Sequence, residues 1–199
     1  MHDYAIFGHD RAAIGRWLGF GAISISGGIT QLFTIASNLS GLEAFTKITI
    51  TTGLIYFSLH WLFNKWVWKI PLFKVPDLNG TWLVKSKTLN EDGSTRFNWN
   101  GEIGVEQDWK KISLHLKTKD SQSNSYTATL SKRDGPTGGW LLSYSYRNEP
   151  ELEQIHELNL HKGFCEIEFD KELTLGRSSY FNSAGRRTFG VMDLTRKIK

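Results

Sequence analysis

The chain has 199 residues, a net charge of +4 and a sequence pI near 9.1, values that on their own suggest a nucleic-acid partner. Residues 1–75 carry a net charge of +3 and residues 76–199 only +1, so the larger part has no basic excess with which to bind a DNA or RNA polymer. The single cysteine, Cys165, excludes an internal disulfide and a multi-cysteine zinc site, and we expect it to be a buried thiol in a strand.

The first part of the chain contains two long segments without charged side chains, residues 17–42 and 48–64. About 20 apolar residues span the hydrocarbon core of a bilayer, so the first segment is ample and the second just sufficient. We therefore predict that residues 1–75 contain two transmembrane helices, at about 17–38 and 47–66. The alternatives are buried helices of a soluble core and, for the first segment, a cleaved signal peptide, which would have a more basic start and a shorter apolar core.

Basic residues lie on the outer sides of both predicted spans. Arg11 and Arg16 flank the start of the first span and three lysines follow the second, whereas the connecting loop contains Lys47 alone. Because cytoplasmic flanks are enriched in Lys and Arg, this pattern predicts a multi-pass membrane protein with both termini in the cytoplasm.

The first predicted span is rich in small residues. Gly15 and Gly19 stand four residues apart, as do Ser24 and Gly28, and this spacing lets two helix backbones approach closely in lipid. These four residues are candidates for self-association of the helices in the membrane. The alternative is that they pack the two predicted helices of one chain against each other.

From residue 76, beyond a linker marked by Pro71 and Pro76, the sequence changes to short alternating segments separated by turn signals. We predict eight strands, at about 79–88, 95–106, 110–118, 124–132, 138–147, 155–161, 164–175 (with a break) and 187–197. Each has one apolar face, which favours a closed, antiparallel, lipocalin-like β-barrel over residues 76–199, because closure removes exposed strand edges. A barrel of this size is filled by its own side chains or holds one small ligand.

The sequence Gly80-x-Trp82 at the start of the first barrel strand, with Arg196 late in the last, is similar to the lipocalin pattern. In that family the tryptophan seals one end of the barrel and a basic side chain from the final strand lies across its ring. We assign Gly80, Trp82 and Arg196 to closure of the barrel.

Motifs for catalysis and metal binding are lacking in the sequence. It contains no P-loop, dinucleotide fingerprint, nucleophile elbow or paired-histidine motif. His156 and His161 stand five residues apart in a predicted strand and so fall on opposite faces. We therefore expect no catalytic residue, no metal site and no cofactor, and a protein that is not an enzyme.

The most distinctive stretch is LGRSSYFNSAGRRTFG, residues 175–190, which places arginines beside an aromatic ring at a predicted strand–turn–strand corner. Arginine forms bidentate hydrogen bonds to phosphate, and aromatic rings stack on bases. The alternative is a solvated basic turn. With two tyrosines from other predicted barrel strands, the candidate ligand-binding residues are Tyr126, Tyr144, Tyr180, Asn182, Arg186 and Arg187.

Over its full length the chain resembles the two-transmembrane, β-strand-rich effectors of bacterial cyclic-oligonucleotide-based anti-phage signalling systems (CBASS). The resemblance rests on the two predicted spans, on Leu78-x-Gly80-x-Trp82, and on the C-terminal pattern from Leu175 to Gly190 followed by Leu194, Arg196 and Lys197. Tyr180, Asn182, Arg186 and Arg187 fall within that C-terminal pattern.

The resemblance implies a bacterial inner-membrane protein whose cytosolic barrel binds a 3′,3′-cyclic dinucleotide made by a partner nucleotidyltransferase. It also implies that binding drives homo-oligomerisation in the lipid bilayer, membrane disruption and abortive infection. The rival hypothesis is a membrane-tethered, lipocalin-like carrier of an apolar ligand, and a third is a structural module whose barrel is filled by its own side chains.

Overall fold

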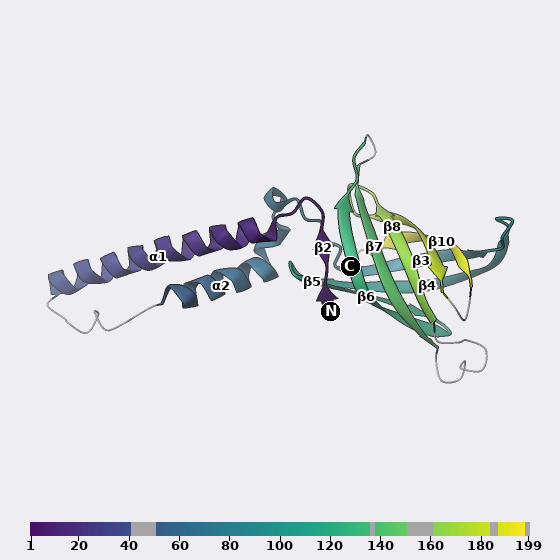
Figure 1. Cartoon of the computed structure of the whole chain (residues 1–199), viewed down its shortest axis with the longest axis horizontal. Coiled ribbons are helices and arrows are strands. Elements are labelled where there is room, and N and C mark those ends of the chain that lie inside the picture. The colour runs from purple at the N-terminus through teal and green to yellow at the C-terminus, as the bar shows by residue number, and fades with distance from the viewer. Residues whose placement is uncertain (41–50, 136–137, 151–160, 184–186, 198–199) are drawn as a thin grey trace. The chain divides into compact units, whose positions relative to one another are not determined.

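The computed structural model describes residues 1–40, 51–135, 138–150, 161–183 and 187–197. The chain forms two compact units, which are treated separately below. One consists of residues 9–73 and is helical, and the other combines residues 1–8 with residues 74–199 and is a β-barrel (Figure 1). The sequence-based boundary at residue 76 left the first eight residues with the membrane segment, whereas in the structure they group with the barrel.

The helical unit consists of α1 (Arg11–Ser40), α2 (Thr52–Lys65) and the short 3₁₀ turns η2 (Val67–Lys69) and η3 (Pro71–Phe73). Among the described residues, α1 is the one helix long and apolar enough to cross a membrane. The second helix was predicted at 47–66, but it begins only at Thr52, whose neighbour Thr51 caps it by accepting the Leu54 N–H at 3.2 Å. Its 14 residues span about 21 Å, short of the roughly 30 Å hydrocarbon core. The prediction of two full-length spans therefore holds for α1 alone, and residues 41–50 lie outside the described part.

The barrel consists of eight antiparallel strands in up-and-down order, as the sequence predicted. Neighbours in sequence pair throughout, and pairing of the last strand with the first closes the sheet. The strands are β3 (Gly80–Leu89), β4 (Thr95–Gln107), β5 (Lys111–Thr118), β6 (Ser121–Lys132), β7 (Trp140–Pro150), β8 (His161–Phe169), β9 (Leu175–Asn182) and β10 (Phe189–Arg196).

One of the predicted strands has the wrong bounds. The strand expected over 164–175 is instead the end of β8 and a turn, and 175–182 forms a strand of its own, β9. Asp170 builds this turn, because its carboxylate accepts hydrogen bonds from the backbone N–H groups of Thr174 and Leu175 at 2.8 and 3.0 Å. Leu173 adopts the left-handed conformation there, with a φ of 54°. The strand expected at 155–161 lies outside the described residues except for its last, His161, which begins β8.

Two short strands at the N-terminus complete the sheet. β1 (His2–Asp3) pairs antiparallel with β5, and β2 (Ala5–Ile6) pairs parallel with β6. β5 and β6 pair directly only over residues 115–117 and 122–124. Residues 1–8, which we call the N-terminal strap, therefore pair alongside β5 and β6 where the direct pairing of these two strands ends.

One end of the barrel is closed by Trp82, which is fully buried. Its indole N–H donates to the Leu78 carbonyl at 3.1 Å, and the Arg196 guanidinium lies 5.3 Å from its ring centroid. Arg196 in turn donates to the Asp77 carbonyl at 3.1 Å. Gly80 has a φ of +125°, a conformation that a residue with a side chain rarely adopts. These contacts join the first and last strands in the manner of a lipocalin closure.

Candidate ligand-binding site

A cavity of about 450 Å³ lies inside the barrel at the end opposite Trp82, because it is lined by the last residues of β3, β5, β7 and β9 and the first residues of their neighbours. This volume is within the range of roughly 300–1,000 Å³ that is typical of small-molecule sites. Most of its lining is aromatic or neutral and polar. The lining includes Thr88, Asn98, Trp99, Asn100, Leu116, Thr118, Lys119, Asp120, Ser123, Tyr144, Tyr146, Asn148, His161, Tyr180, Asn182, Thr188 and Met192.

Tyr180 crosses the interior from β9 towards β3. Its hydroxyl lies 2.8 Å from Thr88 Oγ1 and accepts a hydrogen bond from the Trp99 indole at 3.3 Å. Gly190, the residue beside Tyr180 on β10, makes this path possible. A Cβ at Gly190 would lie 2.7 Å from the Tyr180 hydroxyl oxygen, closer than real Cβ contacts come.

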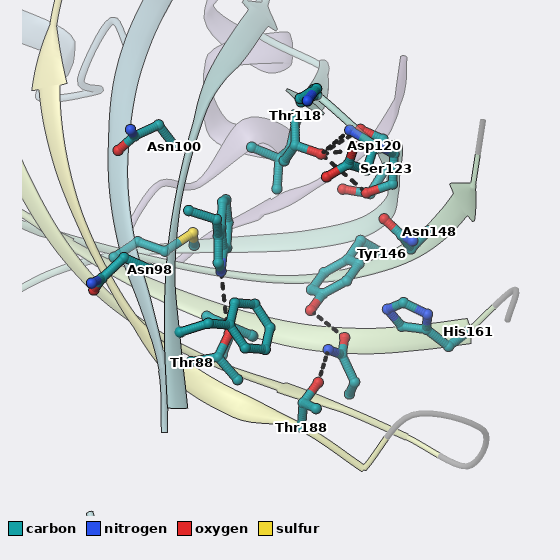
Figure 2. Close-up of a pocket in the computed structure, with 18 of the residues that line it drawn as sticks. Thr88, Asn98, Asn100, Thr118, Asp120, Ser123, Tyr146, Asn148, His161 and Thr188 are labelled. Atoms are coloured by element: carbon teal, nitrogen blue, oxygen red, sulfur yellow. Dashed lines mark hydrogen bonds between the residues drawn. The ribbon is translucent and has the colours of Figure 1, made fainter. Parts of the chain in front are cut away.

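Tyr146 follows a parallel path one row nearer the end of the barrel. Its hydroxyl donates to Asn182 Oδ1 at 2.8 Å, and Asn182 Nδ2 donates to Thr188 Oγ1 at 2.7 Å (Figure 2). Gly163 stands between Tyr146 and Asn182 in the sheet, and a Cβ there would overlap the Tyr146 ring. Both amide atoms of Asn182 are therefore used in holding the wall of the cavity.

Deeper in the barrel, Tyr144 and Cys165 are fixed in their neutral forms. Burial raises the pKa of the Tyr144 phenol well above its usual value and raises the pKa of the Cys165 thiol to about 12. Cys165 is thus the buried strand thiol that the sequence indicated, without thiolate character at neutral pH.

Few charges line the cavity. Among the described lining residues the Asp, Glu, Lys and Arg side chains are Asp120 and Lys119, which are neighbours in the turn between β5 and β6. No cluster of His, Cys, Asp or Glu able to hold a metal ion occurs within the described ranges. The site as described offers flat aromatic surfaces and neutral hydrogen-bonding groups, which suit the faces and edges of nucleobases.

The structure brings together three of the six candidate ligand-binding residues, since Tyr144, Tyr180 and Asn182 all line the cavity. Arg187 is exposed and adjoins the lining residue Thr188, with a φ of 31° in the turn before β10. Arg186 lies outside the described residues.

Tyr126 was expected among these residues, but it is 45% exposed and does not line the cavity. Strict alternation from Ala128 and Leu130 would turn it inward. A β-bulge shifts the register of β6 between Ser125 and Thr127, and the extra residue leaves Tyr126 on the outer surface.

Sequence reasoning missed Asn148 and His161, both of which are buried and line the cavity. Asn148 lies just beyond the strand predicted at 138–147, because Asn148, Glu149 and Pro150 are residue types typical of a turn. Alternation along β7 carried the relevant signal, because an inward face at Tyr144 and Tyr146 continues to Asn148.

The small residues of α1 have different surroundings within the helical unit. A Cβ at Gly15 would lie 3.9 Å from the Tyr56 hydroxyl, so Gly15 faces α2. Within the described part of the chain, Cβ atoms at Gly19 and Gly28 would meet nothing within 4 Å, and Ser24 is exposed. Gly15 thus fits packing within one hairpin, whereas Gly19, Ser24 and Gly28 are not covered by α2.

Comparison with known proteins gives two family matches that together span most of the chain. Residues 73–196 match the family described as "Cap15, cyclic dinucleotide receptor domain", and residues 12–69 match "Cap15, TM helices". The chain is also similar to "CD-NTase-associated protein 15" of Yersinia aleksiciae, with 36% identity over 207 residues that cover 98% of this chain and 97% of the relative.

Proposed function

Because this chain belongs to the Cap15 family of CBASS-associated proteins, which combine a cyclic dinucleotide receptor domain with transmembrane helices, we propose that its barrel is the sensor of an anti-phage effector. The sensor binds a 3′,3′-cyclic dinucleotide supplied by a partner nucleotidyltransferase. The observation that carries the proposal is the cavity, lined by aromatic and neutral polar groups, within the segment that matches the receptor domain.

The ligand-binding residues follow from the positions of the side chains around this cavity. Tyr144 and Tyr180 offer aromatic surfaces to the bases, and Asn182 holds Tyr146 in place. Arg187, which adjoins the lining residue Thr188, and Lys119 contact the phosphates from the rim. Arg186, the neighbour of Arg187 in the sequence, is assigned the same role. Most of the cavity lining is polar or aromatic. This favours a cyclic dinucleotide over the apolar cargo of a carrier, which needs an apolar cavity. A cavity of about 450 Å³ also argues against a barrel filled by its own side chains.

The output is self-association in the inner membrane, with both termini and the barrel in the cytoplasm. If the ligand binds the assembly-competent state more tightly, it shifts the equilibrium by that difference in affinity. Confinement to a membrane raises the effective concentration of the helices, so a modest difference suffices. The uncovered face of α1 at Ser24 and Gly28 then packs against other copies, and the clustered helices disrupt the bilayer. The protein acts by assembly and not as an enzyme.

The test uses the full chain reconstituted in liposomes that contain a fluorescent dye. Addition of the cognate 3′,3′-cyclic dinucleotide is expected to release the dye, and the matching linear dinucleotide is the control. Dye release without ligand, or none with any cyclic dinucleotide that the protein binds, would contradict the proposed mechanism.

A further inference from the structure

A row of buried polar side chains crosses three adjacent strands at the cavity. Asn148 of β7 pairs with Ser123 of β6 on one side and with His161 of β8 on the other. The three residues are 4%, 7% and 5% exposed in the order Ser123, Asn148, His161, and all line the cavity (Figure 2). This row lies next to the one formed by Tyr146 and Asn182, so it belongs to the wall that a ligand would contact.

Asn148 differs from Asn182 in what its amide nitrogen contacts. Asn148 Nδ2 is buried and has no hydrogen-bond partner, whereas both amide atoms of Asn182 are bonded to Tyr146 and Thr188. Buried donors are nearly always paired in folded proteins, because an unpaired one has lost its water without gaining a protein partner. An unpaired donor in the wall of a cavity therefore indicates a bond that a ligand completes.

The surroundings of Asn148 indicate which part of the ligand accepts this hydrogen bond. The charged side chains of the described lining, Lys119 and Asp120, belong to the turn between β5 and β6, and the neighbours of Asn148 across the sheet are Ser123 and His161. The ring of Tyr146, two residues away, lies 5.9 Å from that of Tyr144 and extends an aromatic surface along the same strand. Asparagine amides characteristically read base edges, and aromatic surfaces stack on base faces.

We propose that Asn148 is a specificity-determining residue of the cyclic dinucleotide site, with Nδ2 donating a hydrogen bond to an acceptor atom on the edge of one base. Asn182 then has a positioning role, since its amide is already used to fix Tyr146. This inference rests on the proposed function and deepens it by naming the group that distinguishes one base from another.

The test is calorimetric titration of the full chain in lipid nanodiscs with cyclic di-AMP, cyclic di-GMP, cyclic GMP–AMP and cyclic di-UMP, all 3′,3′-linked. Asn148→Ala is compared with Asn124→Ala, in which an exposed asparagine of the adjacent strand β6 is truncated. We expect the ligand that binds best to lose about tenfold in affinity with Asn148→Ala, as for one hydrogen bond. The affinity differences among the four ligands should shrink, and Asn124→Ala should bind like the wild type.

The thermal stability of the unliganded protein separates this role from a structural one. Asn148→Ala removes an unpaired buried donor, so its Tm should equal or exceed that of the wild type, whereas Asn182→Ala breaks two hydrogen bonds and should lower the Tm. An equal loss for all four ligands would mean a contact with the sugar–phosphate ring, and it would overturn the inference, as would no loss or a lowered Tm for Asn148→Ala. If the wild type binds none of the four, the proposed function itself fails.

Discussion

At the scale of single residues, the cavity depends on two glycines that leave room for two tyrosines. Gly190 admits the hydroxyl of Tyr180, and Gly163 admits the ring of Tyr146. The tyrosines then reach across the barrel to polar partners on other strands instead of filling its centre. A strand glycine of this kind marks a close approach of another group more often than a flexible point in the chain.

Gly163→Ala should therefore harm both stability and binding. The added methyl group displaces Tyr146 and breaks its bond to Asn182, and overpacking of this kind lowers the free energy of unfolding by about 1–3 kcal/mol. Chemical denaturation and ligand titration measure the two effects. Gly104→Ala in β4 is the matched control, because its Cβ would lie at an ordinary 3.9 Å from the His115 carbonyl oxygen. Equal stability of the two variants would show that Tyr146 is free to move.

The residues of the site were only partly predictable from the sequence, and the reasons are local. Tyr180 and Asn182 were selected for the residue types of the stretch 175–190, although β9, the strand that carries them, was not predicted, and Tyr144 follows from strict alternation along its strand. Tyr126 does not follow from alternation, because a β-bulge interrupts the alternation and the residues around it do not indicate one. Asn148 was not predicted because its neighbours Glu149 and Pro150 are typical of a turn, although β7 continues through them.

At the scale of elements, one buried side chain of the barrel, Gln107, anchors both segments that connect the barrel to the helical unit, the N-terminal strap and the segment at Pro76. Gln107 Nε2 donates to the Tyr4 hydroxyl at 3.0 Å and to the Pro76 carbonyl at 3.1 Å, and its Oε1 accepts the Leu78 N–H at 2.8 Å. Tyr4 precedes α1 in the chain and Pro76 follows α2, so one buried side chain fixes the two segments that lead to the helices. His2 Nε2 lies 2.8 Å from Ser125 Oγ, at the point where β5 and β6 separate.

Loss of the strap's anchor should destabilise the barrel itself. Tyr4 is 4% exposed, and its hydroxyl also donates to the Asp108 carbonyl at 3.2 Å. Tyr4→Ala is expected to lower the free energy of unfolding of the barrel by about 3–5 kcal/mol, the usual cost of truncating a buried aromatic side chain. Phe7→Ala, at a side chain that is 68% exposed, is the control and should change the unfolding free energy by less than about 0.5 kcal/mol. Denaturant unfolding followed by tryptophan fluorescence measures both, and a stable Tyr4→Ala variant would mean that the strap is dispensable.

The architecture of the barrel was largely readable from the sequence, but the strap was not. Eight alternating segments with frequent turn signals indicated the barrel, and Gly80-x-Trp82 together with Arg196 indicated how it closes. The strap contributes two strands of two residues each, too short for any periodicity to be recognised. The seventh barrel strand, β9, was not predicted as a strand of its own, since the turn at Asp170 that precedes it lacks the Gly or Pro that marks most of the others.

At the scale of the whole molecule, the proposal separates sensing from output. The cavity belongs to the barrel unit, whereas the uncovered small residues belong to α1. A substitution in α1 should then reduce ligand-induced dye release without changing the affinity for the ligand. Gly15, which faces Tyr56 of α2, is expected to matter for the hairpin of a single copy.

Ser24→Leu tests this separation. A bulky side chain on the uncovered face of α1 blocks close packing of helices between copies, so ligand-induced dye release should fall at least about tenfold while ligand affinity stays within about twofold of the wild type. Thr30→Leu, at another exposed position of α1 that is not part of the small-residue spacing, is the control and should still release dye. If Ser24→Leu responds as the wild type does, this face of α1 does not carry the assembly.

The most direct measurement is binding of 3′,3′-cyclic dinucleotides to the full chain in lipid nanodiscs, with the corresponding linear dinucleotides and a fatty acid titrated in parallel. The full chain is needed because residues 1–8 are part of the barrel. We predict that one cyclic dinucleotide binds with a Kd below about 1 μM and that its linear form binds far more weakly. Binding of the fatty acid alone, with no cyclic dinucleotide bound, would contradict the account and identify the barrel as a carrier.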